Sequence, residues 1–303
     1  MANVKFNFVI NKQANHYFFV SNLSEWHFSN RKKYNELWLE KLGALSEKEK
    51  GGLSRFKKIR KKYNESKSVF EKSFFLTNAP YEQLQQELPK KEVQEINEVM
   101  DLFNDKFEII YKEDLPLLEK WGGILTKEAN DITQTQKIIK KLETFYKFEL
   151  ESDKTVTCHL LINPQEMFLG GGANIDDSSI TCEISHFSLE YTGYVISHHW
   201  HEATHLIFEE KFFIPFLREY FNKDMEKVSM FKELINSSFF PRGILGKEIF
   251  NQKLNDEIYY RYVVKKEQST KIFELSQEYL DNKKAVDTKY LDKLSMYLQI
   301  KNG

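Results

Sequence analysis

The sequence predicts an α+β fold that is mostly helical, with a small β-sheet placed ahead of one histidine-rich helix. Three observations lead to this prediction. Apolar residues recur every three or four positions over most of the 303-residue chain, as they do in amphipathic helices. Two runs rich in β-branched residues, 155–162 and 179–185, are typical of strands. The segment 191–212 combines an apolar helical pattern with four histidines.

The N-terminal half is predicted to be helical after one short strand at residues 5–11. The apolar segment 16–28 fits either a helix or a strand. Helical spacing then covers 32–63, with a break at Gly51-Gly52, and continues over 66–76, 80–104 and 128–149. Between the last two, 107–111 is expected to be a short strand or a helix end. Trp121-Gly122-Gly123 is expected to form a turn.

The second half contains the two predicted strands and then returns to helices. The triple glycine between the strands, 170–172, is expected to be either a flexible hairpin loop or a place where a substrate backbone approaches closely. Helices are predicted at 213–222, 224–236, 246–266, 270–283 and 287–300. This order suggests a first part, residues 1–212, that ends with the histidine-rich helix. Residues 213–303 would form a helical C-terminal lobe.

The most informative motif is His201-Glu202-Ala203-Thr204-His205. Two histidines four residues apart on a helix lie on the same face, where one metal ion can touch both rings. Glu202 is angled away from that face, within reach of a water molecule near the metal. The chain's own histidine and glutamate content predicts roughly 0.02 chance occurrences of the pattern. The alternative is a pair of core histidines satisfied by hydrogen bonds.

This pentad resembles the active-site motif of the zincin metallopeptidases. The resemblance covers the active-site helix well and the rest of the chain loosely. It implies a zincin-like fold, a Zn²⁺ cofactor held by His201 and His205, and cleavage of peptide bonds with Glu202 as general base. The strands ahead of the helix fit the sheet whose edge binds an extended substrate in many zincins. The third histidine of the metzincin branch is absent, because position 211 is Lys211.

The gluzincin branch instead takes its third zinc ligand from a glutamate on a later helix. Asp224, Glu226 and Glu257 are the candidates. Glu257 is preferred, because the helix predicted around it is partly apolar and would hold the carboxylate still, whereas Asp224 and Glu226 lie in a highly charged segment. Tyr260 and Arg261 would share the helical face of Glu257, so either could stabilise an oxyanion.

Composition limits the other function classes. The chain has 44 basic and 45 acidic residues, a balance that argues against binding to nucleic acid or to an anionic membrane. It shows no signal peptide and no run near the ~18 apolar residues of a membrane span, so the default location is cytoplasmic. Cys158 and Cys182 are expected to be buried thiols. The expected partner is a peptide or protein substrate.

Three functions are consistent with these patterns. The first is a zinc metallopeptidase of the gluzincin type. The second is a zincin-fold binding or regulatory protein without peptidase activity. It is motivated by the unusual third-ligand spacing and by Arg261, which stands where the thermolysin-like pattern has an aspartate. The third is a helical interaction protein whose pentad is accidental. A ligand trio of His198, His201 and His205 is a further alternative, although three ligands from one straight helix fit poorly around a tetrahedral ion.

Overall fold

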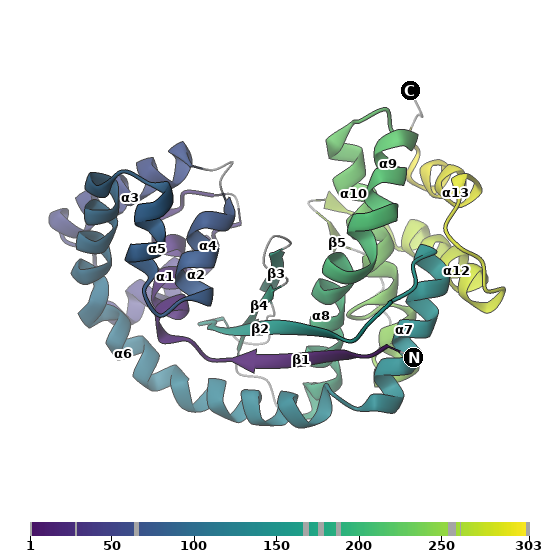
Figure 1. Ribbon diagram of the computed structural model, residues 1–303, viewed down its shortest axis with the longest axis horizontal. Helices are drawn as coiled ribbons and strands as arrows, with labels where there is room; N and C mark the ends of the chain where they lie inside the picture. Colours follow the sequence, from purple (N-terminus) through teal and green to yellow (C-terminus); the bar gives the residue numbers. More distant parts are fainter. Residues whose placement is uncertain are drawn as a thin grey trace. The chain divides into compact units, whose positions relative to one another are not determined.

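The structure is a computed structural model that describes residues 2–27, 29–63, 67–165, 170–174, 179–185, 189–253, 259–260 and 262–300. Figure 1 traces its elements along the chain. The strands are β1 (Val4–Val9), β2 (Lys154–Ile162), β3 (Gly170–Asn174), β4 (Ser179–Ile184), β5 (Tyr259–Tyr260) and β6 (Tyr262–Val263). The helices of the first half are α1 (Lys12–Ser24), α2 (Lys32–Leu42), α3 (Glu47–Lys62), α4 (Lys67–Leu76), α5 (Pro80–Glu87), α6 (Lys90–Glu128) and α7 (Ile132–Tyr146). Those that follow are η3 (Leu189–Tyr191), α8 (Thr192–Thr204), η4 (His205–Phe213), α9 (Ile214–Tyr220), α10 (Met225–Phe239), α11 (Ile244–Phe250), α12 (Lys266–Asp281) and α13 (Thr288–Leu298).

The mostly helical α+β class is confirmed. The larger sheet has four strands in the order β1-β2-β4-β3, and the smaller one pairs β5 with β6. Strands β2 and β4 correspond to the two β-branched runs read from the sequence, and β1 corresponds to the predicted N-terminal strand. No helix within the described ranges combines the length and the apolar character needed to cross a membrane.

The glycine-rich segment is a strand rather than a flexible loop. Strand β3 pairs antiparallel with β4, from Gly170 opposite Glu183 to Asn174 opposite Ser179. A side chain at Gly170 would overlap the carboxylate of Glu183. That carboxylate accepts a 2.6 Å hydrogen bond from the Tyr34 hydroxyl. The absence of a side chain at position 170 therefore makes room for a tertiary hydrogen bond.

The expected interruptions at 107–111 and 121–123 are wrong, because both lie within one continuous helix, α6. Phe107 and Trp121 are fully buried. Side-chain packing along this helix outweighs the local preference of Gly122-Gly123 for a turn. A Cβ at position 122 would touch Ile10 and Leu160 at 3.5 and 3.6 Å, so Gly122 lies where the helix packs closely against its neighbours.

The predicted helix over 246–266 is also wrong. Helix α11 ends at Phe250, and β5 and β6 form a short antiparallel pair with Tyr260 opposite Tyr262. The run Tyr259–Val264 is aromatic and β-branched, a composition that favours strands over helices. The apolar spacing that suggested a helix here is therefore better explained by the hairpin.

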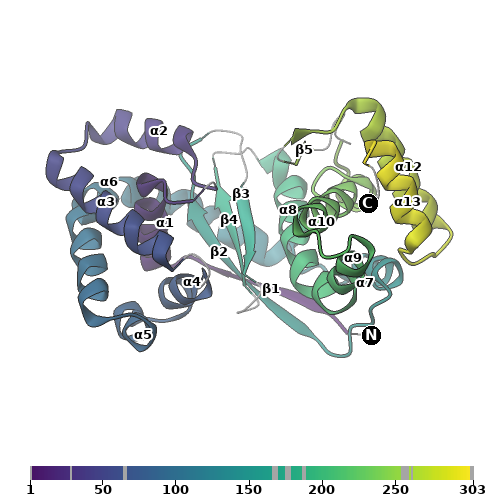
Figure 2. The ribbon, with the colours of Figure 1, turned by 90° about the horizontal axis from the view of Figure 1, so that it is seen from above.

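Contacts divide the chain into two compact units, each made of several segments. One contains residues 8–124 and 158–187, and the other contains residues 1–7, 125–157 and 188–303. Within the first, α1 packs against α3 and α4. Within the second, α10 packs against α8 and α12, and α12 lies beside α13 (Figure 2). The histidine-rich helix and the helices that follow residue 212 therefore belong to one unit.

The two cysteines are buried, in the neighbouring strands β2 and β4. Burial raises the pKa of the Cys158 thiol well above its usual range. This outcome agrees with the expectation of buried thiols.

Candidate metal centre

Helix α8 is a buried helix with the histidine pentad near its C-terminal end. Val195 and Ala203 are completely inaccessible, and Trp200 packs edge-on against Phe6 with ring centroids 5.1 Å apart. The Ser197 hydroxyl donates a 2.6 Å hydrogen bond to the carbonyl of Pro241. These contacts fix the rotation of α8 and therefore the direction of its histidines.

The helix does not end after the pentad but widens into a π-helix, η4, that starts at His205. Such segments are rare and frequently occur at functional sites. Phe208, Glu209 and Phe213 of η4 are buried. Pro215 follows in the first turn of α9, where a missing N–H costs little.

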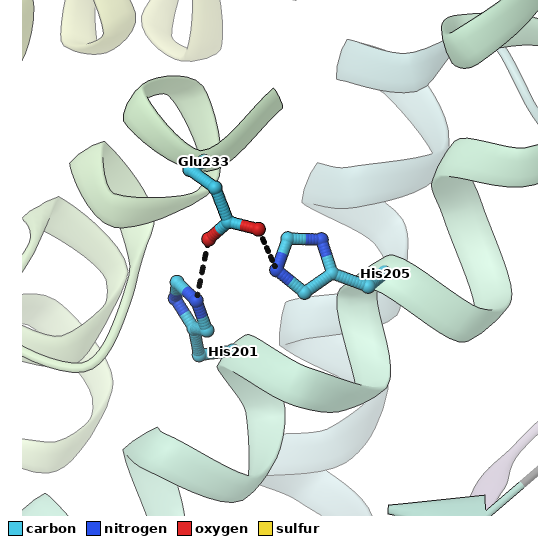
Figure 3. A group of neighbouring side chains, drawn as sticks. All are labelled: His201, His205 and Glu233. Carbon is cyan, nitrogen blue, oxygen red and sulfur yellow. Dashed lines mark ion pairs between the residues drawn. The ribbon is translucent and has the colours of Figure 1, made fainter. Parts of the chain in front are cut away.

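His201, His205 and Glu233 converge on one point (Figure 3). His201 Nε2 lies 3.5 Å from one carboxylate oxygen of Glu233, and His205 Nε2 lies 3.4 Å from the other. The two rings are 5.0 Å apart and perpendicular. Glu233 comes from α10, so the cluster joins two helices that are separate in the sequence.

These distances are longer than ordinary hydrogen bonds and leave room for an ion among the three side chains. N–H···O bonds in proteins are usually about 2.7–3.2 Å long. Atoms bound at ~2.0–2.1 Å to a tetrahedral zinc ion lie about 3.3–3.4 Å from one another. Each Nε2 lies near that distance from a different oxygen of Glu233, His201 from Oε2 at 3.5 Å and His205 from Oε1 at 3.4 Å, and one ligand atom from each residue can be chosen so that all three lie within 4.8 Å of one another. Two imidazole nitrogens and one carboxylate oxygen are also a set that leaves a fourth position for water.

The backbone carbonyl of Phe240 orients the ring of His201. His201 Nδ1 lies 3.2 Å from this oxygen. A carbonyl only accepts hydrogen bonds, so Nδ1 carries the proton and donates it. In the neutral ring, Nε2 then keeps its lone pair and faces Glu233, as a metal ligand requires.

His205 is held in the same way by a carboxylate. Its Nδ1 lies 2.6 Å from Glu209 Oε2, and the Tyr146 hydroxyl donates to Glu209 Oε1 at 3.1 Å. Glu209 is completely buried. Metal-binding histidines commonly donate their second N–H to such a carboxylate, which fixes the ring and increases its basicity.

The third carboxylate also has an outer partner. Lys232 Nζ lies 3.4 Å from Glu233 Oε1. Burial by itself raises the pKa of Glu233, but the imidazoles of His205 and His201 outweigh it and hold that pKa well below its usual range. All three residues of the cluster are therefore oriented by a second contact.

The same carboxylates set the protonation of His205. Burial lowers the pKa of this ring, but Glu209 and Glu233 together outweigh that effect and raise it to about 10. Without a metal ion, His205 therefore carries a second proton near neutral pH. A metal ion would have to replace it.

Asn236 ties α10 to the pentad helix. Its Nδ2 donates a 2.8 Å hydrogen bond to the carbonyl of His201 and lies 3.1 and 3.4 Å from the two ring nitrogens of His205. Similar distances to both nitrogens place the amide against the face of the ring. The buried Oδ1 of Asn236 accepts no hydrogen bond from the described part of the chain. An unsatisfied acceptor beside the cluster fits a site that holds a further group.

Glu202 lies next to the cluster without being part of it. Its side chain is buried, and burial raises its pKa despite the nearby imidazoles of His201 and His205. A buried carboxylate with a raised pKa beside a metal site is suited to accept and return a proton. The role of general base expected from the sequence stays a prediction.

The other sequence-predicted residues lie elsewhere. Asp224 is the exposed N-cap of α10, where its side chain accepts from the Glu226 and Lys227 amides, and Glu226 is exposed in the first turn. Glu257 and Arg261 lie outside the described residues. Tyr260 is described only as backbone in β5, which removes the shared helical face expected for it.

His198 lies outside the cluster, whereas Glu233 belongs to it. The ring of His198 lies parallel to that of His201 at 6.3 Å, but His198 does not join the cluster. Glu233 was not anticipated, although two signals point to it. It lies between the buried Phe231 and Leu234 of α10, and the buried polar Asn236 lies one turn later.

No protein-family model matches this chain, and neither the curated proteins nor the solved structures contain a significant match. What the site can do therefore follows from its side chains. They offer two imidazole nitrogens, one carboxylate oxygen, and a second buried carboxylate next to them.

Proposed function

We propose that this chain is a zinc-dependent hydrolase that cleaves peptide bonds. His201, His205 and Glu233 would hold the ion, and Glu202 would act as the general base. The observation that carries the proposal is the carboxylate of Glu233, which comes from a separate helix to within 3.4 and 3.5 Å of the two Nε2 atoms. A carboxylate from a separate helix beside both Nε2 atoms supplies the third ligand that two helical histidines lack.

The donor set favours zinc over harder cations. Mg²⁺ and Ca²⁺ prefer oxygen ligands, whereas imidazole nitrogen suits zinc and other late transition metals. Two histidines with one carboxylate is the ligand set of catalytic zinc sites that cleave peptides. The outer contacts from Glu209, Phe240 and Lys232 are the kind that hold such ligands in place.

The chain's own residues would supply the proton transfers. A zinc ion in such a site acidifies water and polarises a carbonyl group. Glu202 accepts the proton of the attacking water and then passes it to the departing amine. Its burial and raised pKa bring the carboxyl group closer to the working pH, where it can both take and return a proton.

Metal analysis and one matched pair of variants test the proposal. Protein purified without chelators should contain close to one zinc ion per chain. Glu202→Gln should keep that zinc and lose cleavage of a broad peptide mixture by at least ~100-fold. The matched control, Glu226→Gln, changes an exposed glutamate of α10 and should keep both. Zinc content near zero would contradict the metal site. Bound zinc without any cleavage would favour a binding or regulatory protein instead.

A further inference from the structure

After Gly193, helix α8 is partly exposed along one stripe only. Val195, Ile196, Ser197, His199 and Trp200 are buried, whereas Tyr194 and His198 are not. The positions 194, 198, 201 and 205 are four, three and four residues apart, so they lie on one face of the helix. The accessible face of α8 therefore leads directly to the candidate zinc ligands.

A guanidinium group lies at the far end of this stripe. The Cζ atom of Arg242 is 4.6 Å from the centre of the Tyr194 ring. The two residues before Arg242 are both anchored to α8. The Phe240 carbonyl contacts His201 Nδ1 at 3.2 Å, and the Pro241 carbonyl accepts from Ser197 at 2.6 Å. The position of Arg242 is therefore fixed relative to the zinc ligands.

Among the described residues, no carboxylate lies within ion-pair distance of Arg242, and its side chain is partly exposed. The guanidinium lies over the Tyr194 ring, and none of its N–H groups donates a hydrogen bond within the described residues. The N–H edge of a guanidinium matches a carboxylate, which it can bind through two parallel hydrogen bonds.

The length of the stripe sets where this carboxylate would lie. Tyr194 precedes His201 by seven residues, which is about 10 Å along a helix that rises 1.5 Å per residue. An extended peptide advances ~3.3 Å per residue. A peptide cleaved at the zinc site would thus bring a group about three residues away to Arg242.

We infer that Arg242 binds a carboxylate of the substrate about three residues from the bond that is cleaved. This inference rests on the proposed peptidase function and narrows its substrates to peptides with a negative charge at that distance. The carboxylate could be an aspartate or glutamate side chain or the C-terminus of the peptide, since their chemistry is the same.

Tryptic peptides of casein, either untreated or methyl-esterified at every carboxylate, provide the probe. The zinc-loaded wild-type protein should cleave the esterified peptides at least ~10-fold less than the untreated ones. Mass spectrometry of the products should show a carboxylate about three residues from the cleaved bond. Cleavage three residues from an internal aspartate or glutamate would identify a side-chain carboxylate as the group bound. Cleavage of peptides whose only carboxylate is the C-terminus would identify the C-terminal carboxylate instead.

Arg242→Gln should lower cleavage of the untreated peptides ~10- to 100-fold, to the level of the esterified ones, and Arg242→Lys should recover part of the loss. The matched control, Arg218→Gln, removes an exposed arginine of α9. It should leave the cleavage of untreated and of esterified peptides unchanged. Zinc content and thermal unfolding of each variant exclude misfolding. The inference would be overturned if the Arg242→Gln protein still preferred untreated peptides. It would also be overturned if cleavage of untreated and of esterified peptides fell by the same factor.

Equilibrium binding separates this inference from the proposed function. The zinc-loaded Glu202→Gln protein should bind untreated peptides more tightly than esterified ones. The double variant Glu202→Gln, Arg242→Gln should bind both kinds of peptide equally. If the wild-type protein cleaves nothing but this difference is seen, the hydrolase proposal is wrong and the carboxylate site stands. If binding shows no difference either, both are overturned.

Discussion

Replacing Glu209 by glutamine should weaken zinc binding while leaving the fold intact. Glutamine has the same shape but no charge, so the 2.6 Å contact to His205 Nδ1 loses its ionic character. Removing such an outer carboxylate typically lowers metal affinity 10- to 100-fold, which corresponds to about 1.4–2.7 kcal/mol. Tyr146→Phe removes one hydrogen bond to the same carboxylate, worth about 0.5–1.5 kcal/mol, so it should cost roughly 2- to 10-fold.

Competition with a chromophoric chelator at fixed pH measures these affinities. Glu210→Gln is the control, because it changes the neighbouring glutamate, which is not part of the cluster. The order of affinities should be wild type and Glu210→Gln, then Tyr146→Phe, then Glu209→Gln. Zinc affinity of Glu209→Gln within twofold of the wild type would refute the idea that Glu209 orients a metal ligand. Circular dichroism checks that the variants remain folded.

Three other changes test separate parts of the structure. Glu233→Gln should reduce bound zinc to a small fraction of one ion per chain, whereas Glu226→Gln should keep it; the reverse result would mean that the wrong third ligand has been identified. Burial lowers the pKa of His159 to about 4, so at this residue the unfolded chain binds a proton more tightly than the folded chain does. The neutral ring therefore contributes up to about 3 kcal/mol of stability above pH 6.5, and this contribution is lost as the pH falls towards 4. Urea unfolding at several pH values should show this loss, and His159→Phe should make the slope shallower; an unchanged slope would contradict the assignment. Gly170→Ala should displace the carboxylate of Glu183 and destabilise the protein by about 1–3 kcal/mol in thermal unfolding, and no measurable change would show that this side chain can move at little cost.

Local patterns were sufficient to predict some elements and insufficient for others. The pentad helix and strands β2 and β4 follow from side-chain periodicity, which depends only on neighbouring residues. The continuous helix α6 did not follow, because burial of Trp121 against other segments outweighs the local turn signal of Gly122-Gly123. Strand β3 was missed for a similar reason, since its glycines make room for a side chain on the paired strand.

The third ligand shows the same limit at the site. Two histidines on one turn are placed by helix geometry alone, so His201 and His205 could be chosen from the sequence. The glutamate that joins them depends on how α10 packs against α8, which the Asn236 hydrogen bond to the His201 carbonyl helps to determine. The spacing of the gluzincin resemblance pointed to Asp224 or Glu226, the partly apolar surroundings favoured Glu257, and Glu233 was not considered. Burial of the helix, the criterion applied to Glu257, is met by α10.

The charges around the cluster give an independent reason to expect a divalent cation. The side chains of Glu202, Glu209 and Glu233 all interact electrostatically with the ammonium group of Lys232. With both imidazoles neutral, as metal ligands must be, three carboxylates and one ammonium leave two negative charges in a largely buried region, where uncompensated charge is costly. A doubly charged ion between the Nε2 atoms and Glu233 would cancel that excess without protonating any ligand. Without the ion, the second proton held by His205, whose pKa is raised to about 10, cancels only one of these two charges.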